Sequence, residues 1–383
     1  MNNFSFTTCR SLVNELGGIQ HIADLCRQQG ITRPLIVTDP GIQQLGLLQR
    51  LETLLSQANM PFSSFAEVVA DPPEAIIYAG LSQAKDFAAD GIIGFGGGSS
   101  MDTAKLVALL ARSGQSLTEI YGVNQAQGQR LPLILIPTTA GTGSEVTAVA
   151  IVTTGSTSKM GVVAPQLFPD VALLDAELTV DLPSAITAMT GIDAMVHAIE
   201  AYTSIHRKNP YSDMLAREAL VLMTEHLRRA CQQGDDLEAR QAMLFGACLA
   251  GQAFANAPVA AVHALAYPLG GNYHLPHGLS NSLMLPHVLR FNNANDQANH
   301  WYSELATLIT GTHCKTDGGL VLAAYFDELT AALGLSQRLR DCAIAEADLP
   351  LLASDALQQQ RLLVNNPRTV SEADALALYR AAY

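Results

Sequence analysis

The chain has 383 residues, of which 49% are hydrophobic and only 15% are charged, and its formal net charge is -13. This length exceeds a single ordinary core and predicts two domains, and the high apolar content excludes a disordered chain. The negative charge argues against nucleic acid or an anionic membrane as a partner, because both need a basic face. Small molecules are therefore the expected partners.

The beginning of the chain and the cysteines bear on the cellular compartment. The first ten residues, MNNFSFTTCR, lack a charged region followed by an apolar one, so we expect no secretory signal. The six cysteines are scattered and form no C-x-x-C pair, which is typical of reduced thiols in the cytosol. We therefore expect a cytoplasmic protein.

The first half of the chain alternates short apolar runs with helical stretches. Strands are predicted at residues 34–39, 90–98, 131–137 and 170–175, and helices at residues 73–89 and 99–112. This alternation predicts a mostly parallel sheet covered by helices, in which a ligand binds beyond the carboxyl ends of the strands. We assign this α/β domain to residues 1–184.

A glycine-rich segment, GFGGGSSMDTAK, follows one predicted strand and opens a predicted helix. Gly96, Gly97 and Gly98 let a ligand approach the backbone, and the free N–H groups at the start of the helix favour a pyrophosphate. The alternative is a tight turn in which Ser99 and Asp102 only cap the helix, since Ser99 replaces the third glycine of the usual dinucleotide fingerprint. The loop alone leaves both interpretations open.

Two further strand ends offer polar groups to a dinucleotide. The segment IPTTAGTGSEVT supplies the hydroxyls of Thr138, Thr139 and Thr142. Asp39 ends an earlier strand, where a carboxylate accepts hydrogen bonds from an adenosine ribose and repels a 2'-phosphate. The alternatives are a polar turn for the threonines and, because Pro40 follows, a helix N-cap for Asp39. Together the three strand ends predict a dinucleotide, NAD rather than NADP.

From about residue 185 the pattern is helix after helix, which predicts an all-α domain over residues 185–383. Within it, residues 242–271 contain no Lys, Arg, Asp or Glu and are long enough to cross a bilayer, which needs ~20 apolar residues. Gln252 and Asn256 interrupt this run, and polar side chains are costly at the centre of a bilayer. We therefore expect a buried helix pair instead of a membrane span.

Four residues of the helical half combine as a metal-ligand set. Asp193 and His197 stand four apart in GIDAMVHAIEAY, which places them on one face of a helix. His263 lies in a similarly apolar stretch, and His277 follows a turn that we predict at 270–271. A buried charge needs a partner or a metal, and one carboxylate with three imidazoles suits Fe(II) or Zn(II). For the first two residues, a surface Asp–His pair is the alternative.

Four motifs occur in order over residues 35–290, namely GGGSSMDTAK, PTTAGTGSEVT, GIDAMVHAIEAY and VHALAYPLGGNYHLPHGLSNSLMLPHV. In them the chain resembles the iron-containing (group III) alcohol dehydrogenases. The resemblance implies an N-terminal dinucleotide-binding domain, a C-terminal helical metal-binding domain, an active site in the cleft between them, and a homodimer or higher homo-oligomer. It also implies NAD as the cofactor and Fe(II) as the metal, with Zn(II) as the alternative.

Carried over by position, the resemblance also assigns functional residues. The metal ligands would be Asp193, His197, His263 and His277. The NAD contacts would be Asp39, Gly96, Gly97, Gly98, Ser99, Asp102, Thr138, Thr139, Thr142, Thr147, Lys159 and Leu178. Lys159 carries no signal of its own, and a surface lysine is its alternative.

Two positions depart from the family pattern, and both are candidates for catalysis. Many members have a histidine four residues after the third ligand, where this chain has Tyr267, so the imidazole proton relay often assigned there is missing. Tyr267 lies one helical turn after His263 and is expected to face the same site, as a relay or as a packing ring. Many members also have another residue in place of His274, which here either lines the substrate pocket or lies in solvent.

The expected reaction is the reversible, NAD-linked oxidation of a small alcohol to an aldehyde or ketone. The metal would polarise the substrate oxygen, and the cofactor would take up the hydride. No Lys or Arg lies between Gly251 and Leu289, which favours a neutral substrate over a hydroxy acid unless Arg207, Lys208 or Arg217 reaches in.

Two other functions fit parts of the pattern. One is a related enzyme that recycles bound NAD within one turnover, such as a hydroxyacid-oxoacid transhydrogenase or a dehydroquinate-synthase-like lyase. Free NADH that accumulates with a single alcohol would argue against it. The other is a non-catalytic binding or scaffold protein, and the complete set of metal ligands argues against that.

Overall fold

The computed structural model describes residues 3–155 and 158–383, which form two compact units. One unit spans Thr8–Asp181, and the other joins the N-terminal residues up to Thr7 to Leu182–Tyr383. The sequence did not predict that the first residues belong with the helical part. They do so because the rings of Phe4 and Phe6 pack on Tyr211, with centroids 6.2 and 5.4 Å apart.

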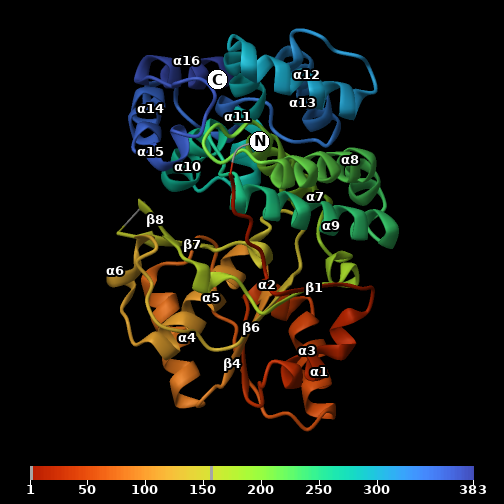
Figure 1. Ribbon diagram of the computed structural model, residues 1–383, viewed down its shortest axis with the longest axis vertical. Coiled ribbons are helices and arrows are strands. Elements are labelled where there is room, and N and C mark those ends of the chain that lie inside the picture. The colour runs from red at the N-terminus through yellow and green to blue at the C-terminus, as the bar shows by residue number, and fades with distance from the viewer. Residues whose placement is uncertain (1–2, 156–157) are drawn as a thin grey trace. The chain divides into compact units, whose positions relative to one another are not determined.

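The α/β unit, Thr8–Asp181, contains two sheets among its described residues (Figure 1). The larger sheet is entirely parallel and has the strand order β1-β9-β6-β4-β2-β3. Its strands are β1 (Ser11–Asn14), β2 (Pro34–Val37), β3 (Ser63–Phe65), β4 (Gly91–Gly96), β6 (Leu133–Pro137) and β9 (Val171–Leu174). The smaller sheet consists of β5 (Gly122–Val123), β8 (Ser158–Val163) and β7 (Val149–Thr154).

Helices cover both faces of the parallel sheet, because its strands are buried on both sides. They are α1 (Ile22–Gln28), α2 (Pro40–Gln44), α3 (Leu47–Gln57), α4 (Glu74–Asp86), α5 (Gly98–Ser113) and α6 (Leu117–Ile120). Alternate residues of each strand face opposite sides. Ile36, Ile93 and Ile134 share a core with α1 and α3, whereas Leu35 and Ile92 share another with α4 and α5. In Figure 1, α1 and α3 accordingly lie on one side of β4 and β6, with α4 and α5 on the other.

The sequence predicted the central strands of this sheet and missed its edges and the hairpin. β2, β4, β6 and β9 fall inside the runs predicted as strands, since fully buried strands are continuous apolar runs. The edge strands β1 and β3 have the sequences SLVN and SSF, which are only partly buried and are not continuous apolar runs. β7 and β8 form an antiparallel pair whose alternating burial is typical of a half-buried hairpin.

The second unit is helical from Leu182 to the C-terminus in its described residues. Its helices are α7 (Ser184–Thr203), α8 (Pro210–Gln232), α9 (Leu237–Asn256), α10 (Ala261–Tyr273), α11 (His277–Asn292), α12 (Asp296–Thr310), α13 (Gly318–Ala332), α14 (Leu349–Leu357), α15 (Gln360–Leu363) and α16 (Glu372–Ala382). The predicted fold class, a parallel-sheet α/β unit followed by a helical unit, is confirmed.

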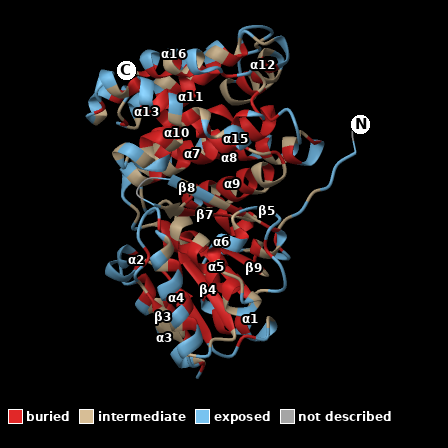
Figure 2. Ribbon diagram, turned by 90° about the vertical axis from the view of Figure 1, so that its left-hand side faces the viewer, coloured by how far each residue is buried: buried red, intermediate tan, exposed pale blue. Residues whose placement is uncertain are grey.

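The longest uncharged segment of the chain forms two helices of this unit. In the described part of the chain, no single helix is long and apolar enough to cross a membrane. The helices α9 and α10 have the required length and hydropathy only when taken together, and they are bent by 106° relative to each other. Residues along both helices, among them Met243, Ala247 and Leu265, are buried within the protein. Figure 2 shows the buried colour running through α7, α9 and α10.

Candidate metal centre and cofactor loops

Three helices of the helical unit bring together the four predicted metal ligands. Asp193 and His197 lie on α7, His263 lies on α10, and His277 is the first residue of α11. One donor atom from each side chain lies within 4.8 Å of all the others. Donors bound to one Fe(II) or Zn(II) ion at ~2.1 Å are separated by at most ~4.2 Å, so this donor set fits such an ion after a small contraction.

Burial makes the cluster asymmetric. The side chains of Asp193 and His263 are only 3% and 2% exposed, whereas that of His277 is 43% exposed. Burial by itself raises the pKa of the Asp193 carboxyl, but the three imidazoles and the Asn281 amide outweigh it and hold that pKa below its ordinary value. The carboxylate is therefore anionic at neutral pH, and the cluster is closed on the Asp193 side and accessible at His277.

The chain reversal before His277 differs from the predicted one. Gly270 and Gly271 lie inside α10, and the helix ends at His274, whose backbone is left-handed with φ 55°. Histidine is among the residues that tolerate this conformation, so the short segment His274–Pro276 makes the turn. A Cβ atom on Gly278 would lie 2.2 Å from the carbonyl oxygen of Met189, so only glycine lets α11 approach α7 closely at this point.

A second carboxylate supports one of the ligands, and the sequence analysis did not single it out. Glu200 is 4% exposed, and its Oε2 lies 2.6 Å from Nδ1 of His263. Its Oε1 accepts a hydrogen bond from the backbone N–H of Val262 at 2.7 Å. When Nδ1 donates its proton to Glu200, Nε2 keeps a free lone pair, which is the tautomer that a metal requires. A glutamate inside the apolar run AMVHAIEAY is a signal that could have revealed it.

Asn281 also lies at the cluster and was not predicted. It follows His277 by one helical turn and is fully buried, and its Nδ2 donates to Oδ1 of Asp193 at 2.6 Å. The same nitrogen lies 3.2 Å from Nε2 of His263 and 3.3 Å from Nε2 of His277. Among the described residues its Oδ1 is buried without a hydrogen-bond partner. Rotation of the amide would turn that oxygen toward the cluster, where it would be an additional donor for a cation.

The structure separates the two catalytic candidates. The ring of Tyr267 lies beside His277, with centroids 5.9 Å apart, so Tyr267 is next to the accessible side of the cluster. His274 is the exposed C-cap of α10 and does not belong to the cluster. The Cζ atom of Arg361 also lies 5.9 Å from the centroid of the Tyr267 ring.

The basic residues that the sequence offered as substrate partners have other contacts. Nζ of Lys208 lies 2.7 Å from Oδ1 of Asp213 and 3.9 Å from the centroid of the Tyr202 ring. Arg217 lies near Tyr202, where its charge opposes the rise in the pKa of the phenol that burial causes. Arg207 is exposed. Arg361 is the basic side chain that the structure brings next to Tyr267, and its distance along the sequence explains why the sequence analysis missed it.

In the α/β unit, the three predicted strand ends meet at one edge of the sheet. β2, β4 and β6 are neighbours, so Asp39, the glycine loop and the threonine loop follow adjacent parallel strands. The backbone N–H of Thr138 donates to the carbonyl of Gly96 at 3.1 Å. A Cβ atom on Gly98 would lie 2.9 Å from the Thr142 side chain, so glycine is needed where the two loops touch.

The glycine loop leaves helix α5 open at its N-terminus. The helix begins at Gly98, and among the described residues no side chain caps its first turn. Free N–H groups at the start of a 16-residue helix attract a phosphate. Ser99 is partly exposed in this turn, as are Thr139 and Thr142 in the neighbouring loop. These groups fit the pyrophosphate of a dinucleotide.

Asp39 is the N-cap of α2, as its alternative interpretation predicted. Its Oδ1 accepts from the N–H groups of Gly41 and Ile42 and caps α2, in which Pro40 is the first residue. Its Oδ2 accepts from the Ser100 hydroxyl at 2.9 Å, which ties the carboxylate to the glycine loop. A carboxylate oxygen has more than one lone pair, so these bonds leave capacity for a ribose hydroxyl.

Two other predicted cofactor residues belong to a buried network around Lys105. Its Nζ is fully buried and donates to Ser144 at 2.7 Å, to the Val149 carbonyl at 2.8 Å and to Thr147 at 3.1 Å. Asp102 accepts from the Ser144 hydroxyl at 2.6 Å. Asp102 and Thr147 thus join α5 to the threonine loop. These contacts fix the distance between the threonine loop and the glycine loop at the start of α5.

The remaining two predicted cofactor residues lie in different surroundings. Nζ of Lys159 pairs with Oδ1 of Asp71 at 2.6 Å and donates to the Thr153 hydroxyl at 3.1 Å. Its side chain is only 12% exposed, so it is not the freely solvated lysine of the alternative interpretation. Leu178 is 2% exposed and packs in the core with α1 and α3, so only its backbone is left to meet a cofactor.

Glu145 lies in the threonine loop and is almost completely buried, at 2% exposure. Burial raises the pKa of its carboxyl to about 7, although the neighbouring Lys105 opposes the shift. Burial also lowers the pKa of Lys105, an effect that the carboxylates of Asp102 and Glu145 oppose. The threonine loop therefore contains a buried carboxyl group that changes charge near neutral pH.

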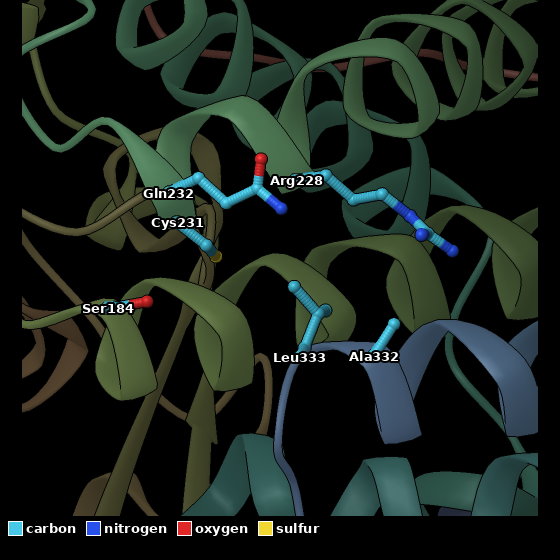
Figure 3. A pocket seen from close by; sticks show the side chains of 6 residues that line it. All are labelled: Ser184, Arg228, Cys231, Gln232, Ala332 and Leu333. Atoms are coloured by element: carbon cyan, nitrogen blue, oxygen red, sulfur yellow. The ribbon is translucent and has the colours of Figure 1, made fainter.

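A small hollow in the helical unit, about 110 Å³ in volume, is not part of the metal cluster. Figure 3 shows its lining from α7, α8 and the end of α13, with the side chains of Arg228, Cys231 and Gln232 directed around it. Burial raises the pKa of the Cys231 thiol, which makes it a poorer nucleophile. This hollow holds none of the predicted site residues.

Comparison with known proteins adds to this geometry. A family model described as "Iron-containing alcohol dehydrogenase" matches residues 9–176, and one described as "Fe-containing alcohol dehydrogenase family, C-terminal" matches residues 187–383. The chain belongs to the iron-containing alcohol dehydrogenase family. The predicted enzyme class, an NAD-dependent alcohol dehydrogenase, is thereby confirmed at the level of the family.

Individual members of the iron-containing alcohol dehydrogenase family match over the whole length. Long-chain-alcohol dehydrogenase 1 of Geobacillus thermodenitrificans is 37% identical, over 96% of this chain and 93% of the relative. The crystal structure of a 1,3-propanediol oxidoreductase has a TM-score of 0.95 and 32% identity, with full coverage of both chains. Sulfoacetaldehyde reductase of Bifidobacterium kashiwanohense, solved in complex with NAD+, has a TM-score of 0.90, 27% identity and coverage of 100% and 99%.

Replacement of Glu200 by Gln should weaken metal binding by about 10- to 100-fold, because a neutral amide no longer fixes the His263 tautomer or raises the basicity of Nε2. The dissociation constant for Zn(II), measured by competition with a chelator, tests this without reference to activity. Glu218→Gln, at an exposed position of α8, is the matched control and should leave the constant unchanged. Equal affinities for E200Q and the parent chain would show that the carboxylate is only a packing group.

Glu145 should make the stability of the chain depend on pH. Its carboxyl titrates near 4.5 when the chain is unfolded and at about 7 in the fold, so folding takes up a proton between these values. Stability is then full below pH 4.5 and falls by on the order of 3 kcal/mol as pH rises through 7. Glu145→Gln should remove this loss.

Urea unfolding at pH 5 and pH 8 measures the effect. The gain of E145Q over the parent chain should be larger at pH 8 than at pH 5. Glu67→Gln, at an exposed glutamate of the same unit, should show no such difference. A gain for E145Q that is the same at both pH values would contradict the assignment.

Proposed function

We propose that the chain is an NAD-dependent, divalent-metal-dependent alcohol dehydrogenase that interconverts a small alcohol and its aldehyde or ketone. The observation that carries the proposal is the cluster of one carboxylate and three imidazoles, with donor atoms within 4.8 Å of one another. Three of these ligands are buried and the fourth, His277, is half-exposed, which leaves an approach for a substrate oxygen. Fe(II) is the proposed metal, supported by the family, and Zn(II) is the alternative that the same donors allow.

Each group has a separate task in this proposal. When bound, the metal supplies positive charge for the oxygen of the substrate, and NAD accepts or donates the hydride. Asp193 supplies the single negative charge among the ligands, and Glu200 keeps Nε2 of His263 unprotonated. The open N-terminus of α5 and the hydroxyls of Thr139 and Thr142 bind the phosphates of the cofactor. Asp39 accepts from the adenosine ribose and disfavours a 2'-phosphate.

Tyr267 is the proposed path for the substrate proton. It lies beside His277 at the accessible side of the cluster, and a phenol both donates and accepts hydrogen bonds. His274 retains at most a role at the mouth of the site, because it is exposed and caps α10.

The substrate charge has two candidates, each with its own support. A neutral alcohol is favoured by the absence of Lys and Arg between Gly251 and Leu289. An anionic substrate is favoured by Arg361 next to Tyr267, and a relative is named for sulfoacetaldehyde, which bears a sulfonate. An anionic substrate also suits the alternative function, a hydroxyacid-oxoacid transhydrogenase that recycles bound NAD.

We propose in addition a cytoplasmic enzyme that forms a homodimer or higher homo-oligomer. The six cysteines are scattered along the sequence and form no C-x-x-C pair, which supports a reducing compartment. The oligomer is supported by the family resemblance, and sedimentation velocity of the purified chain would measure it.

Removal of the metal should abolish the dehydrogenase activity. The chain is treated with a chelator, freed of it, and supplied anaerobically with NAD and a series of short alcohols. Formation of free NADH should fall at least about 100-fold and return with Fe(II) or Zn(II). NAD binding to the metal-free chain serves as the control and should persist, since no metal ligand lies in the cofactor loops.

Full activity without metal would overturn the proposed mechanism. Activity that requires a second, carbonyl-bearing substrate and yields no free NADH would favour the transhydrogenase.

Replacement of Tyr267 by Phe separates a proton relay from a packing ring. Phe keeps the ring beside His277 and removes only the hydroxyl. If the hydroxyl carries the proton, its removal should lower kcat by about 10- to 100-fold. The pH at which kcat begins to fall, on the acidic or the basic side of the rate–pH profile, should also change. An unchanged rate–pH profile would assign Tyr267 to packing alone.

A further inference from the structure

A cation lies beside the aromatic ring that contacts the exposed ligand of the metal cluster. The Tyr267 ring lies 5.9 Å from the His277 ring between centroids, and Cζ of Arg361 lies 5.9 Å from the centroid of the same Tyr267 ring. A guanidinium over an aromatic face keeps its charge and all its N–H donors in the plane of the group. The Tyr267 ring therefore connects the Arg361 guanidinium to the exposed ligand of the cluster, His277.

The backbone of Arg361 is fixed although its side chain is exposed. Arg361 lies on α15, which packs on α10, the helix that carries His263 and Tyr267. Its neighbours Leu362 and Leu363 are buried, at 3% and 7% exposure. The Asn365 side chain donates to the Arg361 carbonyl at 3.1 Å. The guanidinium thus extends from an anchored turn toward Tyr267.

The nearby carboxylates already have other partners. Asp193 and Glu200 are buried against the imidazoles and the Val262 N–H group, and Asp355 accepts from Asn272 at 3.0 Å. Among the described residues no carboxylate oxygen lies within 4.0 Å of Arg361. The contact with the Tyr267 ring is worth roughly 0.5–1 kcal/mol at an exposed site and uses none of the N–H donors of the guanidinium.

We infer that Arg361 binds an anionic group on the far end of the substrate, so that this chain acts preferentially on small alcohols and aldehydes that carry a carboxylate or a similar oxyanion. The inference rests on the proposed dehydrogenase function and names the substrate class of the same site. It replaces the neutral substrate that the sequence favours, because that expectation considered only residues 251–289. In the direction of reduction, hydride from NADH adds to the carbonyl carbon and a proton to its oxygen, which gives the hydroxy anion and NAD+.

The test compares substrates of equal length and different charge. The metal-loaded enzyme is assayed with NADH and three aldehydes that have a four-carbon chain: 4-oxobutanoate, butanal and 4-(trimethylammonio)butanal. The expected order of kcat/KM is anion, neutral, cation. In Arg361→Gln the ratio of kcat/KM for 4-oxobutanoate over butanal should fall by about 10- to 100-fold, the usual effect of losing a hydrogen bond to a charged group, and mainly through KM.

Arg340→Gln is the matched control, since Arg340 is another exposed arginine of the helical unit. This substitution should leave the ratio of kcat/KM for 4-oxobutanoate over butanal unchanged from that of the parent chain. Arg361→Lys retains the positive charge and should keep part of the preference for the anionic aldehyde over the neutral one. If Arg361 were only a structural contact, the preference would not depend on the charge at this position.

A second readout does not depend on turnover. Phenylglyoxal modifies accessible guanidinium groups, and peptide mapping measures the modification of Arg361. 4-Hydroxybutanoate should slow it several-fold in the presence of NAD, whereas butan-1-ol should not. Arg340 should be modified at the same rate with either compound.

The outcomes distinguish the two proposals. Turnover of butanal and 4-oxobutanoate with equal kcat/KM, unchanged in R361Q, would overturn the role of Arg361 and leave the dehydrogenase intact. Absence of turnover with every aldehyde would overturn the proposed function, and phenylglyoxal protection then decides separately whether Arg361 binds an anion. If Arg361 is modified at the same rate with 4-hydroxybutanoate as with butan-1-ol, Arg361 does not bind the anion.

Discussion

The negative charge of Asp193, buried in the interior of the helical unit, is the constraint on which the proposed site depends. A carboxylate without water is costly unless other groups compensate it, and here three imidazoles and an amide do so. Those groups come from α7, α10 and α11, so the three helices must be held in a fixed relation. The contact of Gly278 with the Met189 carbonyl fixes α11 against α7, and the Glu200 carboxylate fixes His263 on α10.

The α/β unit is proposed to bind a different ligand, an extended dinucleotide rich in oxygen. Parallel strands direct their carboxyl ends to one edge, so three segments that are distant in the sequence meet there without further interactions. The buried Lys105 then sets their spacing through Ser144, Thr147 and Asp102. This network explains why polar residues of the threonine loop are buried although they carry hydroxyl groups. They serve the geometry of the loop, while Thr139 and Thr142 remain accessible.

Much of this could be predicted from the sequence, for identifiable physical reasons. The buried central strands and long amphipathic helices repeat with a clear period, and Asp193 and His197 stand one helical turn apart. The pairing of these residues with His263 and His277 followed from the unusual occurrence of imidazoles in apolar runs. The structure brings the four together, and whether they bind metal remains a prediction.

The groups that were missed share a property: their roles arise from contacts between distant segments. Arg361 meets Tyr267 through the packing of α15 on α10, and no local pattern marks it. Glu200 and Asn281 stood inside the recognised motifs, but only their distances to the ligands assign them a task. The turn predicted at Gly270–Gly271 was wrong because glycine is also tolerated inside a helix, and His274 adopted the left-handed conformation in its place.

The order of the two units along the chain has a consequence for synthesis. The α/β unit is one continuous segment, Thr8–Asp181, and can fold as soon as it has left the ribosome. The residues before it cannot, because Phe4 and Phe6 pack on Tyr211, and Thr7 hydrogen-bonds to Asn256. Residues 4–7 are thus synthesised before the α/β unit, but they reach their native contacts only after residues 211 and 256 have been synthesised.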